Sequence, residues 1–192
     1  DQILVQLADQ CIENAIGCYA LPLGFIPCCV VDDHAYVVPL AIEETSVIAA
    51  LSKMAKWTQQ SGRLTTHVKG RGCIGQVHLP EATNLEKIRI LLNQYAPQWM
   101  QEANQQVLPN RAKRGGGVID FELRALPSGA GMVIHVIVDA CDAMGANMVN
   151  QVCEFLAPKM GVAFGERIGI CIVSNAHDRE IVHAELRLEG VP

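Results

Sequence analysis

Aromatic and charged residues are scarce in this sequence. Phe, Trp and Tyr make up 5% of the 192 residues, and Asp, Glu, Lys and Arg make up 18%. Half of the residues are hydrophobic, which excludes a disordered chain and is typical of a globular protein with ample core material.

A basic excess and a long apolar run are also missing. The formal net charge is −5 and the isoelectric point is about 5.6, whereas a protein that binds phosphate backbones needs a basic face. No stretch approaches the ~18 uninterrupted apolar residues of a membrane span. The sequence starts with Asp1 and Gln2 rather than a basic leader. We therefore expect a soluble, cytoplasmic protein with neither nucleic acid nor membrane as a partner.

The cysteines do not form a Cys-x-x-Cys pair, so the pattern of a zinc ribbon is absent. They lie mostly inside apolar runs, which does not fit a small disulfide scaffold either. We expect no metal site, and reduced thiols that pack as small hydrophobic side chains. The eight cysteines are Cys11, Cys18, Cys28, Cys29, Cys73, Cys141, Cys153 and Cys171.

The first 69 residues predict a helix, a pair of extended runs and a second helix. An amphipathic pattern is already under way at residue 3, without an initiator methionine. Extended runs at 21–31 and 35–42 flank a turn, and a helix is predicted at 45–60, ending at Ser61 and Gly62. Residues 180–192 alternate like a strand, and we expect the sequence to be a piece of a longer protein.

Residues 70–174 predict the order β-α-β-β-α-β. The expected strands are 72–79, 118–126, 132–140 and 166–174; the expected helices are 83–105, with a break or kink at Pro97, and 145–160. This order is that of a ferredoxin-like, α+β fold, in which two helices cover one face of an antiparallel sheet. Val133, Ile137, Phe121 and Ile170 are core candidates.

The segment DAMGANMVNQ, residues 142–151, follows the apolar run at 132–141. A strand that leads through a glycine turn into a helix presents free N–H groups and the positive helix end, which suit a phosphate or pyrophosphate. Gly145 lets a ligand approach the backbone closely. Asp142 is expected either to cap the helix or to bind a ribose hydroxyl. In the alternative without a ligand, Asp142 only caps the helix and Gly145 packs against the sheet, and no Gly-x-Gly-x-x-Gly motif is present.

DAMGAN, together with ENAIG at 13–17 and VPLAIEETSVIAALSKMAK at 38–56, resembles 3-hydroxy-3-methylglutaryl-coenzyme A (HMG-CoA) reductase, and most closely the soluble class II type. The resemblance implies NAD(P)H-dependent, two-step reduction of HMG-CoA to mevalonate and coenzyme A, or the reverse oxidation. It also implies a homodimer whose active site lies at the subunit junction. On this basis residues 1–69 and 175–192 belong to a large substrate-binding domain, into which a ferredoxin-like NAD(P)-binding domain, residues 70–174, is inserted.

The resemblance assigns Glu44 as the catalytic glutamate and Ser46 as a contact of the hydroxymethylglutaryl group. A protonated carboxyl beside a thioester carbonyl donates to the oxygen as hydride arrives. Without the resemblance, Glu43 and Glu44 at a helix start are partners of the helix dipole. The motifs also match residues of the substrate and coenzyme A region, Glu13, Asn14, Ile16 and Gly17, and residues of the dinucleotide-binding motif, Asp142, Met144, Gly145 and Asn147.

The catalytic lysine, aspartate and histidine of that family lie beyond residue 192, and nothing in this sequence matches them. The chain on its own is therefore expected to bind a ligand without turnover.

Arg111, Lys113 and Arg114 precede three glycines and suit the 2′-phosphate of NADPH, which we favour over NADH. A solvated loop is the alternative for these residues. For the chain as a whole, a noncatalytic dinucleotide-binding module and an assembly module are the alternatives.

Overall fold

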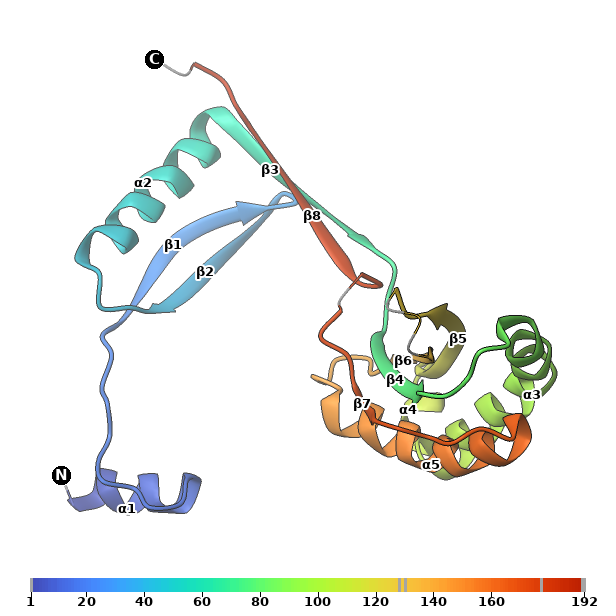
Figure 1. Ribbon diagram of the computed structural model, residues 1–192. Helices are drawn as coiled ribbons and strands as arrows, with labels where there is room; N and C mark the ends of the chain where they lie inside the picture. Colours follow the sequence, from blue (N-terminus) through green and yellow to red (C-terminus); the bar gives the residue numbers. More distant parts are fainter. Residues whose placement is uncertain (1, 128, 130, 177, 191–192) are drawn as a thin grey trace. The chain divides into compact units, whose positions relative to one another are not determined.

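The computed structural model describes residues 2–127, 129, 131–176 and 178–190. The chain divides into two compact units, unit 1 (Asp1–His67 with His183–Pro192) and unit 2 (Val68–Val182) (Figure 1). Strand β3 (Gly62–Lys69) leads into unit 2 and β8 (Ile181–Leu188) leads out of it, and these two strands pair. Unit 2 is thus inserted into the sequence of unit 1.

Unit 1 contains a β-hairpin and helices as predicted. Its further elements are α1 (Gln2–Cys11), β1 (Leu23–Val31), β2 (His34–Ala41) and α2 (Thr45–Ser61). The hairpin turns on Asp32 and Asp33, both with positive φ (49° and 65°), which aspartate tolerates better than most residues. Hydrogen bonds from the hydroxyl and backbone N–H of Thr66 lower the pKa of Asp32 and connect the turn to β3. Strand β3 itself was not predicted, because RLTTHVK is too polar to show a buried face.

Unit 1 buries few side chains within the described residues. Its buried residues are Ile26, Ala55 and Thr58. The apolar side chains that predict α1 are exposed, with Ile3 at 78%, and Ile16 in the following segment is fully exposed. Large apolar patches of this kind mark surfaces that bind another part of a protein or a partner.

Unit 2 forms a four-stranded sheet with helices on one face. Its elements are β4 (Cys73–Leu79), α3 (Leu85–Gln106), α4 (Pro109–Ala112), β5 (Gly117–Ala125), β6 (Met132–Asp139), α5 (Ala146–Phe164) and β7 (Cys171–Val173). The strand order is β5-β6-β4-β7, and each neighbouring pair is antiparallel. Helices α3 and α5 cover the sheet (Figure 1). The predicted order of strands and long helices is found, with the short α4 in addition.

The core of unit 2 lies between this sheet and the two long helices. Alternate residues of β6, from Met132 to Val138, face the helices and pack with buried residues of α3 and α5. Val133 and Ile137 are buried, but on the opposite face of the sheet. Phe121 packs against the core as expected, whereas the prediction for Ile170 was wrong, since it is 63% exposed.

Two element boundaries differ from the prediction. Helix α3 continues past Pro97, so the break, one of the two expected outcomes there, is not found; Tyr95 and Trp99 stack on each other and Trp99 is buried in the core. Strand β7 has only three residues, since the chain before it, around Gly169, bonds irregularly to His78. Packing thus overrides the local tendency of proline to end a helix.

The cysteines only partly follow their prediction. Cys153 is fully buried, and this burial raises the pKa of its thiol to about 12. Cys11 and Cys18 are exposed, so the expectation that the thiols pack as small hydrophobic side chains was wrong for these two. Within the described residues, the helices are too short or too polar to cross a membrane.

The sheet face away from the helices carries a charged cluster over His135. His135 is 6% exposed and lies opposite Glu122 in the β5–β6 register, so both side chains share this face. Glu122 forms ion pairs with Arg124 and Arg179, and Arg124 pairs with Asp178 at 3.2 Å. Nδ1 of His135 has no hydrogen-bond partner among the described atoms. The cluster connects the segment before β8 to the sheet.

We expect His135 to make the stability of unit 2 depend on pH. Burial, and next the charge of Arg124, lower the pKa of His135 below 6.5. As the pH falls, His135 therefore takes up a proton in the unfolded chain before it does so in the folded chain. The contribution of neutral His135 to the free energy of unfolding is fully present above about pH 6.5. Below this pH the free energy of unfolding declines, by at most about 1.4 kcal/mol per pH unit.

Urea unfolding of the wild type and of His135→Gln between pH 7.5 and 5 measures this contribution. The substitution is expected to flatten the pH dependence in this range, because glutamine does not titrate. Equal slopes for the two proteins would show that other groups cause the pH dependence.

Candidate functional site

A turn at residues 140–145 connects β6 to α5. Its last residue, Gly145, is the N-cap of α5 with a φ of 92°, a left-handed conformation that glycine adopts without strain. A Cβ added here would lie 3.0 Å from Cβ of Ala140 and 3.1 Å from Sγ of Cys73. Gly145 therefore packs against the end of the sheet, as the alternative without a ligand expects.

Among the described residues, no side chain caps the N-terminus of α5 by a hydrogen bond. Asp142 does not cap the helix, so that part of the alternative was wrong, and its side chain is exposed together with those of Met144 and Asn147. The first N–H groups of this 19-residue helix are left for another acceptor. A helix start with free donors and a positive dipole end favours an anion.

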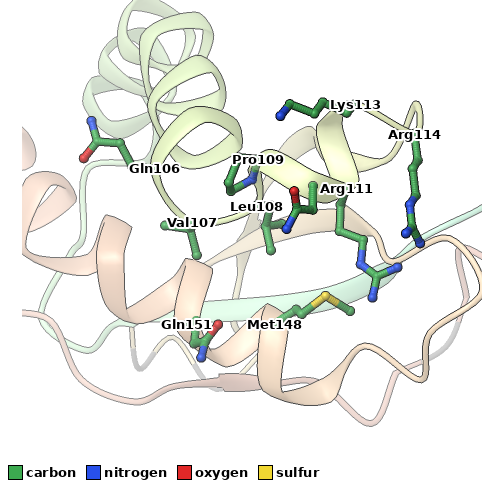
Figure 2. Close-up of a pocket in the computed structure, with 10 residues that line it drawn as sticks. Gln106, Val107, Leu108, Pro109, Arg111, Lys113, Arg114, Met148 and Gln151 are labelled. Carbon is green, nitrogen blue, oxygen red and sulfur yellow. The ribbon is translucent and has the colours of Figure 1, made fainter.

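The basic loop is the segment 107–116, between α3 and β5, which carries Arg111, Lys113 and Arg114. A cavity of about 560 Å³ lies between this loop and the first turns of α5. Figure 2 shows the residues around it. The loop includes the short α4, which starts at Pro109, a residue favoured at the first position of a helix. Leu108 is buried and anchors the loop to the core. The lining residues are Gln106, Val107, Leu108, Pro109, Asn110, Arg111, Lys113, Arg114, Met148 and Gln151.

The cations of this loop are available for an anionic ligand. Among the described residues, no carboxylate lies within ion-pair distance of Arg111, Lys113 or Arg114. In Figure 2 the guanidinium groups of Arg111 and Arg114 extend in the same direction, while Lys113 extends over α4. Met148, in the first turn of α5, lines the same cavity as these three cations. The structure thus places the predicted basic residues beside the helix that follows the 142–145 turn.

Glu44 and Ser46 lie together at the start of α2 in unit 1. The hydroxyl of Ser46 donates a 2.9 Å hydrogen bond to Oε1 of Glu44, and Glu44 is the N-cap of α2. Both side chains are exposed. Glu44 thus occupies the positive helix end, as the dipole alternative expects, and its carboxyl remains accessible to a ligand.

The ENAIG segment follows α1 and is mostly exposed. Glu13, Asn14 and Gly17 are exposed, and Asn14 has a φ of 55°. Within the part of the chain that the structure describes, no hydrogen bond or ion pair joins this segment to Glu44 or Ser46. Nor do the described residues contain a group of three or more histidine, cysteine or acidic side chains placed to hold a metal ion.

The chain is similar in sequence and in structure to known proteins. The model of the hydroxymethylglutaryl-coenzyme A reductase family matches residues 2–191. The chain belongs to this family. The HMG-CoA reductase of Archaeoglobus fulgidus is 34% identical over 97% of the chain and 46% of its own length. The probable HMG-CoA reductase of Borreliella burgdorferi is 30% identical over 85% of the chain and 37% of its own length.

A solved structure of a reductase has a similar backbone. It is the class II HMG-CoA reductase of Streptococcus pneumoniae bound to NADPH in open conformations, which is 33% identical and has a TM-score of 0.89. The alignment covers 96% of this chain and 50% of that one. The chain therefore spans about half the length of the reductases that it matches.

Several residues that line the cavity were not predicted. Leu108 precedes α4, and Met148 and Gln151 lie in α5; none of them belongs to a motif, so the sequence gives no direct signal for them. Asp139 ends a strand that is apolar apart from His135, and this contrast is a signal.

Proposed function

We propose that unit 2 binds a nicotinamide dinucleotide and prefers NADPH. The supporting observation is the cavity, where cations without carboxylate partners face the first turns of a helix with an uncapped N-terminus. The N–H groups at Gly145 and after it would hold the pyrophosphate, with Asp142, Met144 and Asn147 around them. Arg111 and Arg114 would bind the 2′-phosphate, because guanidinium groups match phosphate geometry.

The element order of unit 2 supports the same role. The order β-α-β-β-α-β and the antiparallel sheet order fit a ferredoxin-like cofactor domain, for which we propose residues 70–174. The similar reductase of S. pneumoniae binds NADPH. We propose that residues 1–69 and 175–192 contribute to the substrate-binding domain.

We infer that the chain provides part of a class II enzyme that reduces HMG-CoA to mevalonate and coenzyme A, or runs the reverse oxidation. Bound NAD(P)H supplies the hydride. Glu44 would donate a proton to the thioester carbonyl oxygen, and Ser46 would orient this carboxyl through its 2.9 Å hydrogen bond and contact the substrate. We propose that Glu13, Asn14 and Gly17 line the substrate and coenzyme A region.

The chain alone is expected not to turn over substrate, because no residue of this sequence matches the family's catalytic lysine, aspartate and histidine. The exposed apolar residues of unit 1, such as Ile3 and Ile16, favour a contact with another surface. We propose that they pack against the rest of the substrate-binding domain and the homodimer interface. They also support the second candidate, an assembly module. Saturable dinucleotide binding distinguishes the two, since an assembly module has no site for it.

Calorimetric titration of the chain with NADPH and NADH tests the proposal. We expect saturable binding of both and tighter binding of NADPH. Replacing Arg111 and Arg114 together with alanine should weaken NADPH binding by about tenfold or more, because charge-assisted hydrogen bonds to the 2′-phosphate are lost. NADH affinity should change much less.

Lys113→Ala is the matched control. Lys113 belongs to the same loop, but its side chain extends in another direction (Figure 2), so its loss should have a smaller effect. Equal losses for NADPH and NADH in the double variant would contradict recognition of the 2′-phosphate. Absence of binding to either dinucleotide would argue against the proposed function of the chain alone.

A further inference from the structure

Asp139, the last residue of β6, uses both carboxylate oxygens. Oδ1 accepts a 2.8 Å hydrogen bond from the backbone N–H of Cys141, and Oδ2 lies 3.2 Å from Nη1 of Arg71. The side chain is 15% exposed. One oxygen therefore holds the turn toward α5, while the other pairs with a cation at the start of β4.

The bond to Cys141 stabilises an unfavourable backbone conformation. Cys141 has a φ of 53°, in the left-handed region that residues with a Cβ rarely adopt. An aspartate that accepts from the N–H two residues later forms a local turn of its own, which compensates for this strain. The direction of the chain between β6 and Gly145 thus depends on the Asp139 carboxylate.

The basic loop packs onto the same point. A Cβ added to Gly116 would lie 2.6 Å from the carbonyl oxygen of Asp139 and 2.6 Å from Sγ of Cys141. The backbone N–H of Gly116 also donates a 3.0 Å hydrogen bond to the carbonyl of Arg111. A shift of Cys141 toward the loop therefore displaces Gly116, and through it the part of the loop that carries Arg111.

We propose that Asp139 is a positioning residue for dinucleotide binding. This inference rests on the proposed function. The carboxylate holds the turn that precedes α5 through the N–H of Cys141. Through Cys141 and Gly116 it also holds the loop that carries Arg111. Asp139 acts through Cys141 and Gly116 and does not itself contact the ligand.

Three variants of the 192-residue chain test this role by calorimetric titration with NADPH and NADH. Asp139→Ala removes both contacts and should weaken NADPH binding by about tenfold, because a hydrogen bond to a charged group is lost. The ratio of NADH to NADPH dissociation constants should fall as well, since the basic loop moves. Asp139→Asn keeps an oxygen for the N–H of Cys141, and Arg71→Ala leaves that bond in place. Both should retain most of the affinity.

The outcomes separate this inference from the function that it deepens. If the wild type binds NADPH and Asp139→Ala binds with unchanged affinity and an unchanged ratio, the positioning role is wrong and the function stands. If Asp139→Asn binds as weakly as Asp139→Ala, the turn does not depend on the oxygen that accepts from Cys141, and the inference is overturned. If Asp139→Ala does not fold, Asp139→Asn is compared with the wild type instead, and a loss of NADPH affinity of about tenfold in Asp139→Asn overturns the inference. A wild type that binds neither dinucleotide overturns the proposed function itself.

Discussion

Replacing Phe164 with alanine is expected to lower the free energy of unfolding of unit 2 by about 3–5 kcal/mol. Phe164 is the last residue of α5 and is 1% exposed. Its ring meets that of Trp99 edge to face, with centroids 5.6 Å apart, so it joins α5 to α3. The carbonyl of Phe164 accepts a 2.8 Å hydrogen bond from Nζ of Lys87. The substitution leaves a cavity at the point where the two helices converge.

Urea unfolding followed by the fluorescence of Trp99 measures this loss. The other tryptophan, Trp57, lies in α2 of unit 1, and Trp57→Phe makes the signal specific for unit 2. Val162→Ala is the control, because Val162 belongs to the same helix turn but is 86% exposed. It should change stability by no more than about 0.5 kcal/mol. A similar small change for Phe164→Ala would mean that α5 does not close the core as the structure shows.

The order of the elements in unit 2 was predictable because its strands and helices are strongly patterned. The strand at 132–139 is apolar almost throughout, and the helices that flank it in sequence start at recognisable residues. Asn84 is the N-cap of α3, and its side chain accepts a 2.9 Å hydrogen bond from the N–H of Lys87. Local signals of this kind do not depend on distant partners.

The direction in which β6 side chains point was not predictable from the sequence. A strand buried on both faces lacks the alternation that identifies an inward face. His135 is buried among Glu122 and Arg124 of β5 and Asp178 and Arg179, which are distant in sequence. The pattern of charges around His135 appears only when β5 and the segment before β8 are folded onto it.

The candidate site was predictable in its parts and not in its assembly. The turn before α5 has a glycine and the loop has a run of basic residues, and each gives a local signal. That Arg111 and Met148 line one cavity depends on the register of β5 and β6, which brings the loop beside the turn. The role proposed for Asp139 depends on the same register, since Gly117 pairs with Asp139.

Replacing Gly145 with valine is expected to weaken NADPH binding by between about tenfold and a hundredfold. A β-branched residue is strained at a φ of 92°, and its Cβ would press on Ala140 and Cys73. The turn must shift to relieve this, and the first N–H groups of α5 then no longer point to the proposed pyrophosphate position. Calorimetric titration with NADPH measures the loss. The buried position of Gly145 indicates that the stability of unit 2 falls as well.

Gly165→Val separates the loss of binding from the loss of stability. Gly165 caps the other end of α5 with a φ of 66°, and a Cβ added there meets no atom within 4 Å. This variant places a β-branched residue in the left-handed region at the other end of the same helix, far from the turn, so it should unfold more easily and still bind NADPH normally. Equal losses of affinity in both variants would assign the effect to the stability of α5. Full affinity in Gly145→Val, with the fold retained, would exclude this turn as the pyrophosphate site, because the donors proposed to hold the ligand would have been displaced without consequence.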